Sequence, residues 1–237
     1  MQFCFIGNSH LDQFNIKSLN TNDQIDTLYS LGASLKGLYN PNSKLQLNEQ
    51  IQKYSFENTE AILVFFLGQV DIEFGYYYKC VCDKIKYKVE DYINELVEGF
   101  EKYLLSSIKN KFVILSINPT VIQNIEHNFN VSFRNDNGYN GFYSHTQDDI
   151  LFDDHKHTIY NDSYDIRFYN NKLMNDYLKS MCIKNNFLYV DFWHIIMENE
   201  SEVKPKYLFE HLDHHLKRTD DTDMIEYILN QIKLLVA

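Results

Sequence analysis

Glycine and proline are scarce in this chain, which has 8 glycines and 3 prolines among its 237 residues. Disordered and loop-dominated proteins are rich in these two residue types, so the composition argues against both classes. Hydrophobic residues make up 44% of the chain, which is enough to bury a sizeable core. We therefore expect a single globular domain over residues 1–237.

Clusters of basic residues are absent as well, and the formal net charge is −11. A nucleic-acid groove needs clustered lysine and arginine to displace counterions, so we expect no nucleic-acid partner. The acidity also disfavours an anionic membrane surface, and no apolar run approaches the roughly 18 residues of a transmembrane helix. The chain starts with a strand pattern rather than a charged leader, so we expect a cytoplasmic protein without a signal peptide.

The four cysteines, Cys4, Cys80, Cys82 and Cys182, include no C-x-x-C pair. A chain of this length needs no disulfide bond to be stable, so we expect reduced and mostly buried thiols. The zinc motif H-E-x-x-H is missing too. No established ligand spacing therefore predicts a metal site.

Short apolar runs alternate with helical patterns along the chain. Residues 2–6, 25–30, 60–67, 112–117 and 187–192 are the strand candidates. Helices are predicted at 86–108, 162–183 and 220–236, because apolar residues recur there at three- and four-residue steps. The alternation is typical of βαβ units and predicts a parallel sheet of five strands. Continuously apolar runs such as 61–67 indicate strands that are buried on both faces.

A polar stretch at 128–161 interrupts this pattern and is rich in Asn, Asp, His and Gly. Long insertions without a period are often functional, and a lid over a site is one hypothesis for this one. Within it, the run Asp153-Asp154-His155-Lys156-His157 could supply half of a metal site. A solvated loop is the favoured interpretation, because such polar runs usually face water.

Small and polar residues follow the first four predicted strands. They are Gly7-Asn8-Ser9-His10, the segments 31–34 and 68–71, and Asn118. In a doubly wound sheet, ligands bind beyond the carboxyl ends of the strands. The coincidence of polar residues after several strands therefore predicts a site at this edge of the sheet.

Ser9 and His215 are the candidate catalytic residues at this edge. Ser9 lies in a tight turn between a strand and a predicted helix, where a hydroxyl can be exposed beside backbone N–H donors. A serine nucleophile needs a base and the base needs an orienting acceptor, which His215 and Asp213 could supply. Two simpler interpretations remain open: Ser9 could only cap the helix, and the His- and Asp-rich segment 211–215 could be a solvated helix start.

The order of these motifs resembles that of the SGNH (GDSL-like) hydrolases over nearly the whole chain. Gly7-Asn8-Ser9 is similar to block I of that family, which is normally Gly-Asp-Ser, and Gly32 is similar to the block II glycine. The segment Gly68-Gln69-Val70-Asp71 resembles block III, normally Gly-x-Asn-Asp. The segment 213–216 resembles the terminal Asp-x-x-His block.

The resemblance implies a three-layer α/β/α, flavodoxin-like fold and acyl-ester chemistry. Ser9 would be the nucleophile, His215 the general base and Asp213 its orienting residue. The backbone N–H groups of Ser9 and Gly32 would form part of the oxyanion hole. The remaining predicted oxyanion and substrate-binding residues are His10, Gly68, Gln69 and Asp71.

Three features depart from the family pattern. Val70 stands where the family has its oxyanion Asn, and the neighbouring Gln69 amide could replace that donor. The last block is one residue short, which changes the reach from Asp213 to His215. His10 directly after the serine is unusual. These features fit a divergent enzyme, one specialised for transfer, or a relative without catalysis.

Acyl transfer on a carbohydrate or nucleotide sugar, with acetyl as the first candidate group, is the function that the sequence favours. A small molecule or glycan would be the substrate; hydrolysis would need no cofactor, whereas a transferase could use acetyl-coenzyme A as donor. Tyrosines at 76–78 could stack on a sugar, or could simply line a helix. An inactive SGNH-like module that binds a glycan or protein is the alternative. A metal-dependent hydrolase using His10, Asp71, Asp213 and His215 is a third possibility. Nothing in the sequence indicates an oligomeric state.

Overall fold

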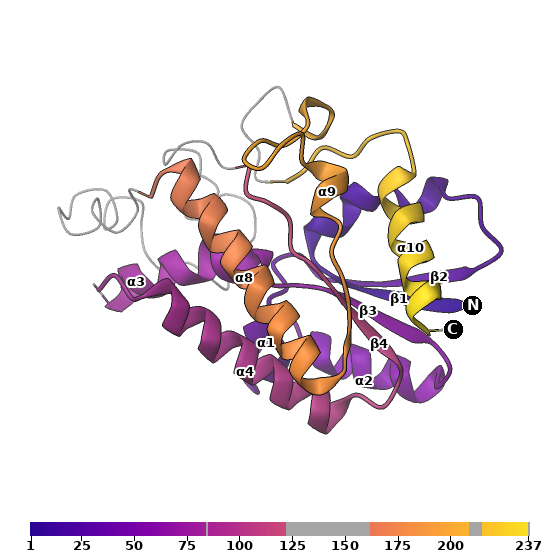
Figure 1. The fold of residues 1–237 in the computed structure, drawn as a ribbon. Helices are drawn as coiled ribbons and strands as arrows, with labels where there is room; N and C mark the ends of the chain where they lie inside the picture. Colours follow the sequence, from indigo (N-terminus) through magenta and orange to yellow (C-terminus); the bar gives the residue numbers. More distant parts are fainter. Residues whose placement is uncertain (84, 122–161, 209–214, 237) are drawn as a thin grey trace.

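The computed structural model describes residues 1–83, 85–121, 162–208 and 215–236 (Figure 1). Its centre is a five-stranded sheet in the order β2-β1-β3-β4-β5, in which every neighbouring pair is parallel. The strands are β1 (Gln2–Gly7), β2 (Gln24–Tyr29), β3 (Ile62–Phe66), β4 (Phe112–Leu115) and β5 (Leu188–Val190). The prediction of a five-stranded parallel sheet is confirmed, and each strand overlaps its predicted segment.

Helices of three kinds connect the strands. The α-helices are α1 (Leu35–Tyr39), α2 (Leu47–Glu57), α3 (Tyr76–Asp83), α4 (Val89–Ser107), α8 (Tyr164–Asn185), α9 (Trp193–Ile196) and α10 (Asp223–Val236). The 3₁₀ helices are η1 (Ser9–Phe14), η2 (Ile16–Ser18) and η5 (Pro205–Tyr207), and η3 (Asp71–Gly75) is a π-helical turn. The three helices predicted from apolar periodicity correspond to α4, α8 and α10.

The helices form a layer on each face of the sheet. One layer contains α1, α2, α4 and α8, and the other contains η1, α9 and α10 (Figure 1). Side chains of β1 alternate between the layers: Cys4 and Ile6 pack toward the first, and Phe3 and Phe5 toward the second. The central strands β3 and β4 are apolar throughout, as expected for strands covered on both faces, and the expected three-layer α/β/α arrangement is confirmed.

Two tyrosines considered as a sugar platform are part of the core instead. Tyr76 and Tyr77 are only 2% and 1% exposed and contact each other, and Tyr76 also contacts the ring of Tyr92 from α4. Their faces are therefore closed to a sugar, and the stacking hypothesis is wrong for this pair. Both residues lie at the start of α3, in agreement with the alternative prediction that these tyrosines line a helix.

Several predictions fall on residues outside the described part of the chain. The insertion at 128–161, with its Asp- and His-rich run at 153–157, is among them, and so is Asp213. Of the cysteines, Cys4, Cys80 and Cys182 are buried free thiols. Within the described ranges, no helix has both the length and the apolar character needed to cross a membrane.

Candidate active site

The turn after β1 presents the Ser9 side chain to His215. The N-cap of η1 is Asn8, whose Oδ1 accepts the backbone N–H of His10 at 3.1 Å. Ser9 is therefore the first residue of the helix and not its cap, so the interpretation of Ser9 as a cap is wrong. Its Oγ lies 2.7 Å from Nε2 of His215, although the two residues are 206 positions apart. This distance is within the reach that a nucleophile and its general base require.

His215 is held by the residues that follow it. Leu216 is buried in the core between the sheet and the α10 layer, and the backbone N–H of Lys217 donates to the carbonyl of Tyr207 at 2.8 Å. To accept the Ser9 proton, Nε2 must be unprotonated, so a neutral His215 carries its proton on Nδ1. The predicted partner of that Nδ1, Asp213, lies outside the described residues.

The loop after β2 brings a second backbone donor toward this edge. Gly32 has a φ of +71°, a conformation that favours glycine. The side-chain amide of Asn8 donates to the carbonyl of Ala33 at 2.9 Å, which ties this loop to the serine turn. Within the described residues, the backbone N–H groups of Ser9 and Gly32 donate to no backbone carbonyl. They are the two donors that the sequence predicts for an oxyanion.

Asp71 joins the loops after β2 and β3. Its two carboxylate oxygens accept the backbone N–H groups of Leu35, at 2.7 Å, and Lys36, at 3.2 Å, at the start of α1. Burial raises the pKa of Asp71 to about 6, and these two donors oppose the rise. The Asp71 carboxylate thus holds the segment that follows Gly32 in place. Both of its oxygens face backbone N–H donors.

Gly68 and Gln69 lie in the same loop after β3. Gly68 has a φ of +119°, and a Cβ there would lie 3.1 Å from Ile117 and Met174, so glycine is required. The Gln69 side chain is buried, and it lowers the pKa of the Glu73 carboxyl. The amide predicted as a replacement oxyanion donor is thus close enough to Glu73 to affect its titration.

Glu73 is a buried carboxyl that sequence reasoning missed. It is 1% exposed, and its Oε1 accepts the side-chain amide of Asn171 at 3.0 Å. Burial raises its pKa to about 7, against hydrogen bonds from Asn171, Thr120 and Gln69 and the charge of Arg167. In the sequence, Glu73 stands among mixed polar and apolar residues at the start of a helix. This pattern does not indicate that its side chain is buried.

A chain of amides links Glu73 to the serine helix. Asn171 donates to the carbonyl of Asn118 at 3.0 Å, and the side chains of Asn118 and Gln13 exchange two hydrogen bonds of 2.8 and 2.9 Å. Gln13 belongs to η1, the helix that begins with Ser9. In the sequence, this network could have been anticipated only from the spacing of Asn171 and Asn175. These residues are four positions apart on the buried side of α8.

His10 is buried against the base. It is 1% exposed, its Nδ1 lies 2.8 Å from Oδ1 of Asn8, and its ring centroid is 4.6 Å from that of His215 with 38° between the ring planes. The structure therefore brings Ser9, His10 and His215 into one cluster. Gly32 is linked to this cluster through Asn8 and Ala33.

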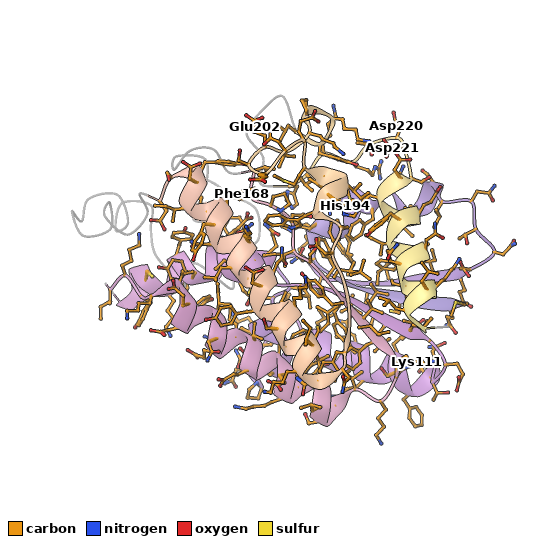
Figure 2. The ribbon with its side chains drawn as sticks, in the orientation of Figure 1. Lys111, Phe168, His194, Glu202, Asp220 and Asp221 are labelled. Carbon is orange, nitrogen blue, oxygen red and sulfur yellow. The ribbon has the colours of Figure 1, made fainter. Side chains whose placement is uncertain are left out.

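Charged side chains lie at both the top and the bottom of the molecule in Figure 2. Lys111, just before β4, lies at the bottom, and Glu202, Asp220 and Asp221 lie at the top. Among the residues with described positions, no three His, Cys, Asp or Glu side chains are grouped to hold a metal ion.

The comparisons with known proteins concern the fold of the chain. No family model and no curated protein matches the sequence. Among solved structures, an aryl esterase from M. smegmatis and a carbohydrate acetylesterase from Sinorhizobium meliloti are 8% and 9% identical to this chain. In both cases 99% of each chain is covered, with a TM-score of 0.56.

A GDSL-like lipase from Bacteroides thetaiotaomicron is 12% identical, covering 100% of this chain and 89% of the lipase, with a TM-score of 0.52. At such identities the likeness concerns the fold. The structural neighbours over the whole length are thus SGNH/GDSL-like hydrolases and esterases, and the chain has the SGNH-hydrolase fold. The resemblance inferred from the four sequence blocks is confirmed at this level.

Proposed function

We propose that this chain is a serine-dependent acyl-transfer enzyme that adds or removes an acyl group on a carbohydrate or nucleotide sugar. Acetyl is the first candidate for the group. The observation that carries the proposal is the 2.7 Å contact between Ser9 Oγ and His215 Nε2 at the carboxyl edge of an SGNH-type sheet. Acyl esters are the substrates that such a pair can attack.

The proposed reaction begins when His215 Nε2 takes the proton of Ser9 as Oγ attacks the acyl carbonyl carbon. The N–H groups of Ser9 and Gly32 donate to the oxygen of the tetrahedral intermediate, which is negatively charged. The intermediate collapses to an acyl-serine, and His215 returns the proton to the departing oxygen or sulfur. Water or an acceptor hydroxyl then attacks the acyl-serine while His215 again serves as the base.

The second step distinguishes an esterase from a transferase. Attack by water completes hydrolysis, which needs no cofactor. Attack by a sugar hydroxyl completes transfer, for which we propose acetyl-coenzyme A as the donor, with its thiol as the leaving group. The assignment to a carbohydrate draws on one structural neighbour that is a carbohydrate acetylesterase and on the resemblance in the sequence.

The proposal is tested by incubation with a small fluorophosphonate, followed by intact-mass spectrometry. The wild type should gain one adduct, and Ser9→Ala should gain none, because only a serine paired with a base is activated toward this reagent. Ser18→Ala is the matched control, since Ser18 is exposed and bonds to Asn15, and it should label like the wild type. A folded wild type that gains no adduct would contradict the proposal.

A non-catalytic glycan-binding module is the second candidate, and Val70 is the observation that favours it. This residue occupies the position at which the resembling family carries an oxyanion Asn, and an oxyanion donor is typically worth about 10²–10³ in rate. Val70→Asn should therefore raise esterase turnover by about tenfold or more if the chain is an enzyme short of one donor. Turnover of a chromogenic acetyl ester measures this, with Val89→Asn in α4 as control. A binding module would show no turnover in either form.

A further inference from the structure

The amide of Asn8 has only one orientation that suits its neighbours. The Ala33 carbonyl can only accept a hydrogen bond, so the atom that faces it is the amide nitrogen, at 2.9 Å. The amide oxygen then faces the backbone N–H of His10, which can only donate, at 3.1 Å. Both contacts support the same assignment of the amide.

This orientation fixes the tautomer of His10. The Asn8 oxygen also lies 2.8 Å from Nδ1 of His10, and an amide oxygen has no proton to donate. Nδ1 therefore carries the ring proton. The ring is 1% exposed, so this hydrogen bond gives a buried ring a fixed orientation.

The fixed ring lies against the base of the proposed reaction. The centroids of His10 and His215 are 4.6 Å apart, and Nε2 of His215 reaches Ser9 Oγ at 2.7 Å. A buried ring in a fixed orientation at this distance limits the positions that the His215 ring can take.

We infer that His10 is a positioning residue: held by Asn8, its buried ring keeps the His215 ring against Ser9. The inference rests on the proposed function. It gives Asn8 two tasks, because the same amide holds the loop that carries Gly32. The oxyanion donor and the base are thereby tied to one side chain.

Removing the ring and replacing it are the two variants that test this inference. His10→Leu should slow fluorophosphonate labelling of Ser9 by about tenfold or more, since the ring contact that holds His215 beside Ser9 is lost. His10→Phe keeps an aromatic face and should recover most of the rate. His194→Leu is the control, because His194 lies in α9 and its ring contacts Tyr227 at 4.7 Å. Circular dichroism confirms that each variant is folded.

The variants separate this inference from the proposed function. Labelling of wild type and His10→Leu at equal rates would overturn the role of His10 and leave the proposed function intact. An unlabelled wild type would overturn the proposed function, and the inference is then decided by nitrogen NMR of the imidazole rings. We expect a proton on Nδ1 of His10 at pH 7, and His215 signals that shift in His10→Leu. A His10 ring without a proton on Nδ1, or unshifted His215 signals, would overturn it.

Discussion

Ser9→Ala and His215→Gln should each lower the turnover of a small acetyl ester by about 10³-fold or more. Without Ser9 no acyl-serine can form, and without His215 the hydroxyl keeps its proton and is a poor nucleophile. The two side chains meet at 2.7 Å and act in the same step. The double variant should therefore lose no more activity than the more damaged single variant.

This non-additivity distinguishes a working pair from two residues that are independently useful. The required rates come from steady-state hydrolysis of a chromogenic acetate by four proteins: the wild type, Ser9→Ala, His215→Gln and the double variant. Ser18→Ala and His194→Leu replace the same residue types outside the cluster and should keep the wild-type rate. Losses that multiply in the double variant would mean that Ser9 and His215 do not share a step.

Glu73→Gln should stabilise the protein at pH 8 and leave its stability at pH 5 nearly unchanged. The cause is the burial that raises the pKa of Glu73 from its ordinary 4.5 to about 7. At pH 8 the wild type must hold a charge in a site from which water is excluded, whereas glutamine is uncharged. Glutamine keeps an oxygen that can accept the Asn171 amide, which contacts Oε1 at 3.0 Å in the wild type.

The direction follows from the protons bound in each state. Below pH 4.5 the glutamate is protonated in both the folded and the unfolded chain, so it contributes nothing. Between 4.5 and about 7 only the folded chain keeps the proton, so the free energy of unfolding falls as the pH rises. The accumulated loss above pH 7 is about 3 kcal/mol, and glutamine should restore about 1–3 kcal/mol of it.

Urea unfolding of the wild type and Glu73→Gln gives the free energy of unfolding of each at pH 5 and at pH 8. The effect of the substitution at pH 8 is then compared with its effect at pH 5. Glu49→Gln is the matched control, because Glu49 is exposed on α2 and its substitution also removes one negative charge. Its effect should be small and nearly equal at both pH values. An equal effect of Glu73→Gln at pH 5 and pH 8 would show that the raised pKa does not govern stability.

The layered fold could be predicted from the sequence because its signals are local. The apolar run at 61–67 belongs to a strand covered on both faces, and the three- and four-residue spacing in α4 places Ile93, Val97 and Phe100 in the core. The short helix α1 was missed because its five residues are too few to show an apolar repeat, although Ser34 caps it locally by accepting the backbone N–H of Gly37 at 3.0 Å. The additional contacts from Asp71, 35 and 36 residues later in the chain, leave no mark in the local sequence.

The candidate site was predictable only in part. Position after a strand singled out Ser9, and its contact with His215 agrees with the pairing inferred from the motifs. The environments of His10 and Glu73 depend on packing between distant segments. Asn8 looked like a simple variant of an aspartate in the block I motif, yet its amide nitrogen bonds to Ala33 in a way that a carboxylate cannot reproduce.

The contact between Ser9 and His215 also has a consequence for the order of events during folding. It closes a loop of 206 residues, and contacts of such long sequence separation require most of the intervening chain to be organised first. The strand pairs β1–β2 and β1–β3 join segments much closer in sequence and can precede it. A refolding chain should therefore regain its secondary structure before its nucleophile becomes reactive, which makes serine reactivity a late reporter of the native state.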